Sequence, residues 1–312
     1  MVAALARAAF SVLAESRTLK RVASRYGLHR PGSFARRFIA GETTAEAILA
    51  ARALEAQGLT VTLDLLGESV ASRDAASRAT DQYIDAIREI GRAGIGRNIS
   101  LKLTQLGLTI DRATAIDNLR RVLDAAAADR FFVRIDMENS PYTDATLETF
   151  ETLWGIGYRD VGVVVQSALR RSAADLARVN ALGARVRLVK GAYSEPREVA
   201  YTRKADVDAA FVELMTPLFR DGAYPAIATH DPAMIEAAKR LAALHHVAPD
   251  GFEFQMLHGV RRDLQASLVA EGFRMRVYVP FGAEWFPYFM RRLGERPANV
   301  GFVIRSVLRE RR

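Results

Sequence analysis

The chain has 312 residues, of which 50% are hydrophobic, and it contains no cysteine. Without cysteine it cannot form disulfides, use a thiolate in catalysis, or bind zinc or an iron–sulfur cluster through sulfur. Lysine and arginine outnumber aspartate and glutamate by 44 to 36, and the net charge of +8 suits an anionic ligand, an anionic membrane surface or a nucleic acid. No run of 18 apolar residues is present, so we expect no transmembrane helix.

Residues 1–57 are rich in alanine, leucine and arginine, and apolar residues recur three and four apart over 11–25 and 43–57. This spacing predicts helices. The apolar start carries Arg7 and has no clean basic segment before it, so we predict a helix there rather than a signal peptide. We therefore expect a helical lead-in over residues 1–57 and a second domain over residues 58–312.

From residue 58 onwards, short β-rich runs alternate with helical patterns. The predicted strands are 60–66, 98–104, 131–137, 161–166, 185–189, 225–229, 252–257 and 274–280. The predicted helices between them are 72–92, 114–128, 144–153, 173–182, 199–218, 232–245 and 264–270. Eight strand–helix units in a chain of this length favour an α/β fold of the closed (β/α)₈ TIM-barrel type over an open doubly wound sheet.

Polar residues end nearly every predicted strand. They are Asp64 with Glu68 just beyond it, Lys102, Asp136, Gln166, Arg187 with Lys190, Thr229 with His230, Gln255 and Tyr278. In a (β/α)₈ barrel the carboxyl ends of the strands form one rim, where active sites lie. Lys102, Asp136 and Arg187 stand inside apolar runs, and a buried charge is costly unless it is paired or liganded. We therefore expect these three residues to belong to a functional site.

The run RLVKGAY, residues 187–193, is typical of a cofactor site. Its strand would bring Arg187 and then Lys190 to the rim, and Gly191 would let the backbone approach a ligand closely. Tyr193 could stack on a flat ring. Thr202 and Lys204 follow near the next helical pattern and could hold a phosphate, while Thr229 and His230 end the next strand in the same way. Together they predict a planar cofactor that bears phosphate.

The last strand leads through a turn at Phe281-Gly282 into a predicted helix from about Ala283 to Arg296. Pro287 fits only in the first turn, and Pro297 ends the helix. Residues three and four apart share a helix face, which groups Tyr288, Arg291, Arg292 and Glu295. Because arginine binds carboxylates in bidentate fashion, this face could form a pocket wall for a small zwitterion. The alternative is a solvated face with an intrahelical ion pair.

Two other motifs predict no site. Residues 91–96 (GRAGIG) precede a strand instead of joining a strand to a helix, so we interpret them as a helix-ending turn and not as a nucleotide loop. His245 and His246 lie at a helix end without a carboxylate in phase, so we expect no metal site there.

Four segments resemble motifs of the proline dehydrogenase family, the flavoenzymes of the first step of proline catabolism. They are RLVKGAY, ATHD (228–231), FEFQMLHG (252–259) and YVPFGAEWFPYFMRRLGERPAN (278–299). The resemblance extends from about Leu63 to Asn299 and is greatest to the small monofunctional bacterial enzymes, so we expect no aldehyde dehydrogenase module within these residues. It implies a distorted (β/α)₈ barrel with noncovalent FAD that oxidises L-proline to Δ1-pyrroline-5-carboxylate by hydride transfer to flavin N5.

The resemblance also implies roles for individual residues. Asp136 and Arg187 would be the catalytic pair, with Arg187 near the flavin N5. Lys102, Arg291 and Arg292 would bind the proline carboxylate, and Leu257, Tyr278 and Tyr288 would enclose its ring. Glu295 would orient the arginines or the amine, and Glu68 would pair with Arg291 as a gate. The implied FAD contacts are Met137, Gln166, Arg187, Lys190, Gly191, Ala192, Thr202, Lys204, Thr229 and His230, with no metal.

The chain departs from the family's pattern at two positions near the expected cofactor. Asp231 follows the Thr-His pair where many relatives have asparagine, and Ser194 stands where some larger relatives have tryptophan. The electron acceptor implied by the resemblance is a membrane quinone, which predicts a cytoplasmic enzyme with peripheral contact at the inner face of the membrane. No nucleic-acid partner is implied.

Two alternatives remain open from the residues alone. Lys102 or Lys190 could be the Schiff-base lysine of a barrel aldolase or decarboxylase. The basic chain could also be a noncatalytic nucleic-acid-binding protein, although its key charges lie at strand ends rather than on an exposed face.

Overall fold

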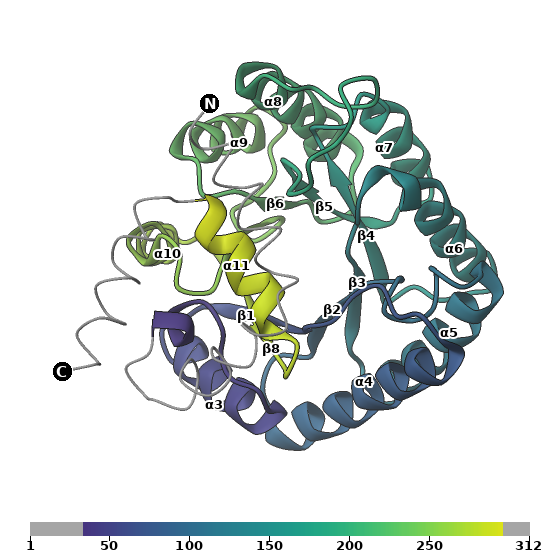
Figure 1. Cartoon of the computed structure of the whole chain (residues 1–312). Coiled ribbons are helices and arrows are strands. Elements are labelled where there is room, and N and C mark those ends of the chain that lie inside the picture. Colours follow the sequence, from purple (N-terminus) through teal and green to yellow (C-terminus); the bar gives the residue numbers. More distant parts are fainter. Residues whose placement is uncertain (1–33, 296–312) are drawn as a thin grey trace.

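A computed structural model describes residues 34–295, and of residues 291–295 it describes the helical path only. In this part of the chain, eight parallel strands close into a barrel in the order β1 to β8 (Figure 1). The strands are β1 (Thr60–Leu65), β2 (Asn98–Leu101), β3 (Phe132–Ile135), β4 (Val161–Gln166), β5 (Arg185–Val189), β6 (Ala226–Ala228), β7 (Glu253–Leu257) and β8 (Arg274–Phe281). The predicted (β/α)₈ barrel is therefore confirmed.

Helices follow the strands, and those from α4 to α10 lie in the outer ring of Figure 1. They are α4 (Arg73–Ala93), α5 (Arg112–Ala128), α6 (Thr143–Gly155) after the short η2 (Ser140–Tyr142), α7 (Ser172–Ala181), α8 (Lys204–Asp221), α9 (Pro232–Leu244), α10 (Arg262–Ala270) and α11 (Trp285–Glu295). Their ends follow local rules. Ser72 caps the start of α4, and Gly94, with a φ of 70°, ends it, which confirms the helix-ending turn. Pro287 is the third residue of α11, inside the first turn.

The described part of the lead-in consists of η1 (Phe34–Arg37) and α3 (Thr44–Glu55). Thr43 and Glu46 form a reciprocal capping box at the start of α3. This helix packs against β1, β8 and α4 (Figure 1). The helix predicted over 43–57 is thus confirmed, and the one predicted over 11–25 lies outside the described residues.

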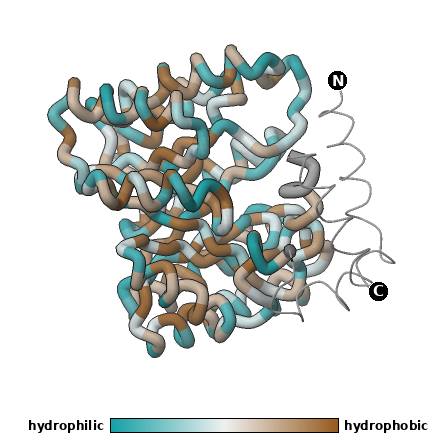
Figure 2. The backbone as a smooth tube through the Cα atoms, turned by 90° about the vertical axis from the view of Figure 1, so that its left-hand side faces the viewer, coloured by the Kyte–Doolittle hydropathy of each residue, from teal (hydrophilic) through white to brown (hydrophobic). Residues whose placement is uncertain are grey.

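The strands alternate between two environments. In β1, Val61 and Leu63 belong to the main hydrophobic core, whereas Thr62 and Asp64 are buried polar residues. Since successive strand residues face opposite sides, the apolar series packs under the helices and the polar series faces the barrel interior. Figure 2 shows hydrophobic segments concentrated inside and hydrophilic ones along the outer helices. This alternation explains why charged residues stand within apolar runs of the sequence.

Two sets of predicted boundaries need correction. β2 ends at Leu101 and β3 at Ile135, so Lys102 and Asp136 are the first residues after their strands instead of lying within them. The helix predicted to begin at residue 199 begins at Lys204, because the preceding loop pairs with the loop after β4. There Ala200 bridges to Leu169, and the Tyr201 N–H donates to the Ala168 carbonyl at 2.8 Å.

A second hydrophobic cluster joins η1 to α11 at the rim. Phe38 and Ile39 pack with Trp285, Phe286 and Phe289, and the indole N–H of Trp285 donates to Glu42 Oε1 at 2.9 Å. This packing holds α11 across the mouth of the barrel, over β8 and β1 (Figure 1). Among the described residues, no helix combines the length and apolarity needed to cross a membrane.

Candidate active site

A cavity of about 580 Å³ opens at the carboxyl ends of the strands. Its apolar wall comes mainly from β4, β5, β7 and the segments beyond them, and its charged groups lie in β5 and just beyond β2, β3, β5 and β6. Its lining is Lys102, Asp136, Met137, Val164, Gln166, Arg187, Val189, Lys190, Gly191, Ala192, Tyr193, Ala228, Thr229, His230, Asp231, Pro232, Gln255, Met256, Leu257, Tyr278 and Tyr288.

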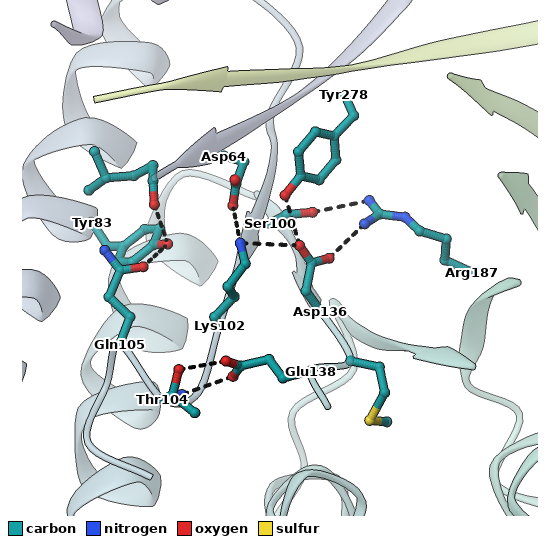
Figure 3. Close-up of polar contacts among 12 residues, drawn as sticks. Asp64, Tyr83, Ser100, Lys102, Thr104, Gln105, Asp136, Glu138, Arg187 and Tyr278 are labelled. Atoms are coloured by element: carbon teal, nitrogen blue, oxygen red, sulfur yellow. Dashed lines mark hydrogen bonds and ion pairs between the residues drawn. The ribbon is translucent and has the colours of Figure 1, made fainter. Parts of the chain in front are cut away.

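Asp136 is the centre of a polar cluster at this rim (Figure 3). Arg187 Nη1 donates to its Oδ1 at 2.7 Å, and the Tyr278 hydroxyl donates to its Oδ2 at 2.8 Å. The ammonium of Lys102 lies 3.8 Å from the same Oδ2. Burial, reinforced by the charges of Asp136 and Asp64, raises the pKa of Tyr278 well above its usual value, so this hydroxyl keeps its proton and acts as a donor.

Lys102 lies between two carboxylates. Its Nζ is 3.5 Å from Asp64 Oδ1, on the side opposite Asp136 (Figure 3). Burial lowers the pKa of Lys102, but the charges of Asp64 and Asp136 raise it by more, so the net shift is upward and the amine stays protonated. A Schiff-base lysine must instead react as a neutral amine, so this arrangement disfavours the aldolase alternative at Lys102.

Arg187 is fixed from two sides, since its Nη2 also donates to Ser100 Oγ at 3.0 Å. Its guanidinium stands 5.4 Å from the centre of the Tyr278 ring. Its Nε is buried and has no hydrogen-bond partner among the described residues. A buried N–H at the wall of a cavity is costly unless a ligand accepts from it, so Arg187 has a donor to offer to a bound group.

Gly191 permits a close approach at the end of β5. Its φ is +113°, and a Cβ at this position would lie 2.9 Å from Gln166 Oε1. The Gln166 amide is itself held by the Glu138 carbonyl at 2.7 Å. The positive φ and the nearby Gln166 side chain therefore favour glycine at this position, whereas the close approach of a ligand stays a prediction.

A second charged group lies where β5, α8 and α9 meet. Lys190 forms ion pairs with Asp208 at 2.5 Å and with Asp231 at 2.8 Å. Lys204 contacts the same two aspartates. Lys190 and Asp231 line the cavity, so this quartet forms part of its wall.

The structure brings most of the predicted site residues together. Those that line the cavity are Lys102, Asp136, Met137, Gln166, Arg187, Lys190, Gly191, Ala192, Thr229, His230, Leu257, Tyr278 and Tyr288. Lys204 reaches it through Asp231, whereas Thr202 is exposed in the loop before α8 and is not part of the lining. Glu68 lines an adjacent cavity of about 360 Å³ that shares Lys102 and Tyr288 with the first.

Three predicted residues cannot be placed at side-chain level. Arg291, Arg292 and Glu295 belong to α11, but their side chains lie outside the described residues. The grouping of both arginines with Lys102, and the gate between Glu68 and Arg291, therefore stay predictions.

Sequence reasoning assigned no site role to five residues of these clusters: Asp64, Ser100, Glu138, Asp208 and Asp231, the last of which was noted only as a departure from the family's pattern. Asp64 was visible as a polar strand end, and Ser100 precedes Lys102 by two positions, the spacing of one strand face. Asp208 follows Lys204 by four positions, the spacing of a helical ion pair. Glu138 offered no such signal.

Comparison with known proteins gives concordant results. The family model described as Proline dehydrogenase matches residues 47–305. A proline dehydrogenase of Deinococcus radiodurans is 43% identical over 281 residues, covering 89% of this chain and 91% of that protein. Proline dehydrogenase 1 of Bacillus subtilis is 40% identical over 304 residues, covering 97% of this chain and 99% of that protein.

Solved structures agree with these sequence matches. The crystal structure of proline utilization A (PutA) from Bdellovibrio bacteriovorus, inactivated by N-propargylglycine, superposes with a TM-score of 0.77 at 28% identity. The match covers 83% of this chain and 32% of that one, so the present chain spans about a third of the length of that larger protein.

Proposed function

The chain belongs to the proline dehydrogenase family, and from this premise we propose that it oxidises L-proline to Δ1-pyrroline-5-carboxylate with noncovalent FAD. The observation that carries the proposal is the cluster of Lys102, Asp136, Arg187 and Tyr278 at the rim cavity, inside the region that the family model matches. A role in nucleic-acid binding would not explain why these four side chains line an internal cavity and do not lie on an exposed face.

The cavity has the features that a flavin dinucleotide needs. Its wall combines apolar side chains with the backbone of Gly191. Arg187 offers a buried N–H without a partner among the described residues. Lys190, beside the start of α9, provides an ammonium group that a diphosphate could contact. We assign the FAD contacts to Met137, Gln166, Arg187, Lys190, Gly191, Ala192, Lys204, Thr229 and His230.

The substrate would bind at the Lys102 side of the cavity. Lys102 is held protonated and can pair with the carboxylate of proline, with Arg291 and Arg292 approaching from α11. Leu257, Tyr278 and Tyr288 line the same cavity and can enclose the pyrrolidine ring. Glu295 would orient the arginines.

The oxidation removes a hydride from carbon and a proton from nitrogen, leaving an imine. No side chain accepts a hydride, and bound FAD supplies that acceptor. The residues supply position and charge: Asp136 and Ser100 fix the Arg187 guanidinium, and Tyr278 fixes Asp136. Fixed positive charge at the site of developing negative charge lowers the barrier without reorganisation.

For the electrons we propose a membrane quinone, as the family resemblance implies. A cytoplasmic protein with a net charge of +8 would be attracted to an anionic membrane surface, which suits peripheral contact.

An absorbance spectrum tests the assignment. The purified protein should show flavin bands that are released on denaturation and that bleach anaerobically with L-proline. Prolinamide, which lacks the carboxylate, should bleach them far more slowly. A folded, colourless protein that cannot be reconstituted with FAD would refute the proposal.

A further inference from the structure

The two lysines assigned to the cofactor already have counter-ions of their own. Lys190 Nζ lies 2.5 Å from Asp208 Oδ1 and 2.8 Å from Asp231 Oδ2. Lys204 Nζ lies 3.4 Å from Asp231 Oδ2 and pairs with Asp208 Oδ2. Two ammonium groups alternate with two carboxylates, so the quartet has no net charge when both aspartates are ionised.

Both aspartates are ionised at neutral pH. Hydrogen bonding from Lys190 lowers the pKa of Asp231. For Asp208, burial raises the pKa, but the two lysines lower it by more, and the net shift is downward. The lysines therefore present no uncompensated charge to the cavity.

Asp231 has a second role at the same place. Its Oδ1 accepts from the Ala233 N–H at 3.1 Å and caps the 13-residue helix α9. The start of a helix is a natural site for a phosphate, because its N–H groups and its dipole favour negative charge. In this chain the carboxylate of Asp231 already occupies it.

We propose that Asp231 and Asp208 are built-in counter-ions that compete with the phosphate groups of the cofactor for Lys190 and Lys204. The proposal rests on the proposed function and concerns only the phosphate-bearing part of FAD. A diphosphate brought to Lys190 either displaces the Asp231 carboxylate or stays close to it, and both weaken binding. The aspartates thus set the affinity for FAD below what the two lysines alone would give.

The test uses apo-protein titrated with FAD and with riboflavin, followed by quenching of flavin fluorescence at low and at high salt. Asp231→Asn removes the charge and keeps a good helix cap. We expect it to tighten FAD binding about three- to thirtyfold at low salt, the scale of one like charge removed from a partly exposed site. Riboflavin carries no phosphate, so its affinity should not change.

Asp81→Asn is the matched control. Asp81 is an exposed residue of α4 that pairs with Arg121 at 2.6 Å, so the variant makes the same change in net charge away from the quartet. FAD affinity should equal that of the wild type. Asp208→Asn provides a second test, because it should also tighten FAD, and circular dichroism verifies the fold of each variant.

The outcomes separate two failures. If Asp231→Asn and Asp208→Asn bind FAD as the wild type does, or more weakly, the aspartates do not compete with phosphate and the inference is wrong while the proposed function stands. If wild-type apo-protein binds no flavin, the proposed function and this inference fail together.

Discussion

Asp64 is the most deeply buried carboxylate of the rim cluster, with 0% of its surface exposed. It does not line the cavity, and its Oδ2 has no hydrogen-bond partner within the described chain. Burial raises its pKa, and the charge of Lys102 opposes that rise. Asp64 pairs with Lys102 and does not line the cavity. We therefore expect it to act through that lysine, by keeping the amine protonated and in position.

Replacing Asp64 with asparagine should therefore shift the pH dependence of proline binding. The charges of Asp64 and Asp136 raise the pKa of Lys102, so removing one of them lowers it, and the amine loses its proton at a lower pH. We expect KM for proline to begin its alkaline rise at a lower pH in the variant, with flavin content unchanged. Steady-state kinetics from pH 7 upwards would show this, and identical alkaline limbs would contradict it.

Arg187 supplies the fixed positive charge closest to Asp136 and Tyr278. Arg187→Met should slow flavin reduction by proline about 10²- to 10³-fold, the usual cost of losing one electrostatic donor. Asp136 would keep Tyr278 and Lys102 as partners, so the barrel should stay folded. Single-turnover reduction in a stopped-flow instrument measures the effect. An unchanged rate would mean that Arg187 has another task.

At the scale of elements, three rim loops are tied together by one buried threonine. The Thr104 hydroxyl donates to Glu138 Oε2 at 2.5 Å and accepts from the Ser69 N–H at 3.0 Å (Figure 3 shows the Glu138 contact). The Thr104 N–H also donates to Glu138 Oε1 at 3.0 Å. Glu138, just beyond β3, therefore fixes the loop after β2, which in turn fixes the loop after β1 that carries Glu68.

Thr104→Val should loosen this connection. It leaves one Glu138 oxygen and the Ser69 N–H without a partner, which costs about 1–3 kcal/mol in the free energy of unfolding. Urea denaturation measures the loss, and faster amide exchange at Ser69 and Val70 would locate it. Thr104→Ser keeps the hydroxyl and serves as the control. Equal stability of the two variants would show that this hydroxyl is unimportant.

These elements also show what sequence could and could not predict. All eight strands were predictable, because apolar runs and turn residues report local structure. The ends of β2 and β3 were not, since they depend on where neighbouring strands stop pairing. Partners such as Asp136 and Arg187 are 51 positions apart in the sequence. They come into contact only through the strand register of the closed barrel, which the spacing of residues does not reveal. The residue roles came from the family resemblance rather than from spacing.

For the whole molecule, the barrel interior beneath the cavity is polar, and several of its charged side chains are hydrogen-bonded to one another or to the backbone. Glu253 accepts from Arg276 at 2.8 Å and from Gln255 at 2.5 Å. Arg134 donates to the carbonyl groups of Val163 and Arg185, and burial lowers its pKa. Gln255 lines the cavity, so one chain of hydrogen bonds links the cavity floor to the lower barrel.

Because the proposed cofactor would contact the ends of four neighbouring strands, β3 to β6, its binding should stabilise the folded barrel. A ligand at about 100 times its Kd adds about 2.7 kcal/mol to the stability. We expect apo-protein to melt a few degrees below FAD-saturated protein, and the difference should grow with FAD concentration. Thermal scans at several concentrations measure it. Coincident curves would show that FAD does not prefer the folded state.

The pairing of the last strand with the first determines when the barrel can close during synthesis of the chain. β8 pairs with β1 from Thr60–Arg276 to Leu65–Phe281, and it carries Tyr278, which completes the contacts of Asp136. While the ribosome is still adding residues, the seven earlier strands have no closing partner and the rim lacks both Tyr278 and α11. The barrel and its rim are therefore complete only after β8 has been made, and a nascent chain that stalls before β8 exposes two open sheet edges to chaperones and proteases.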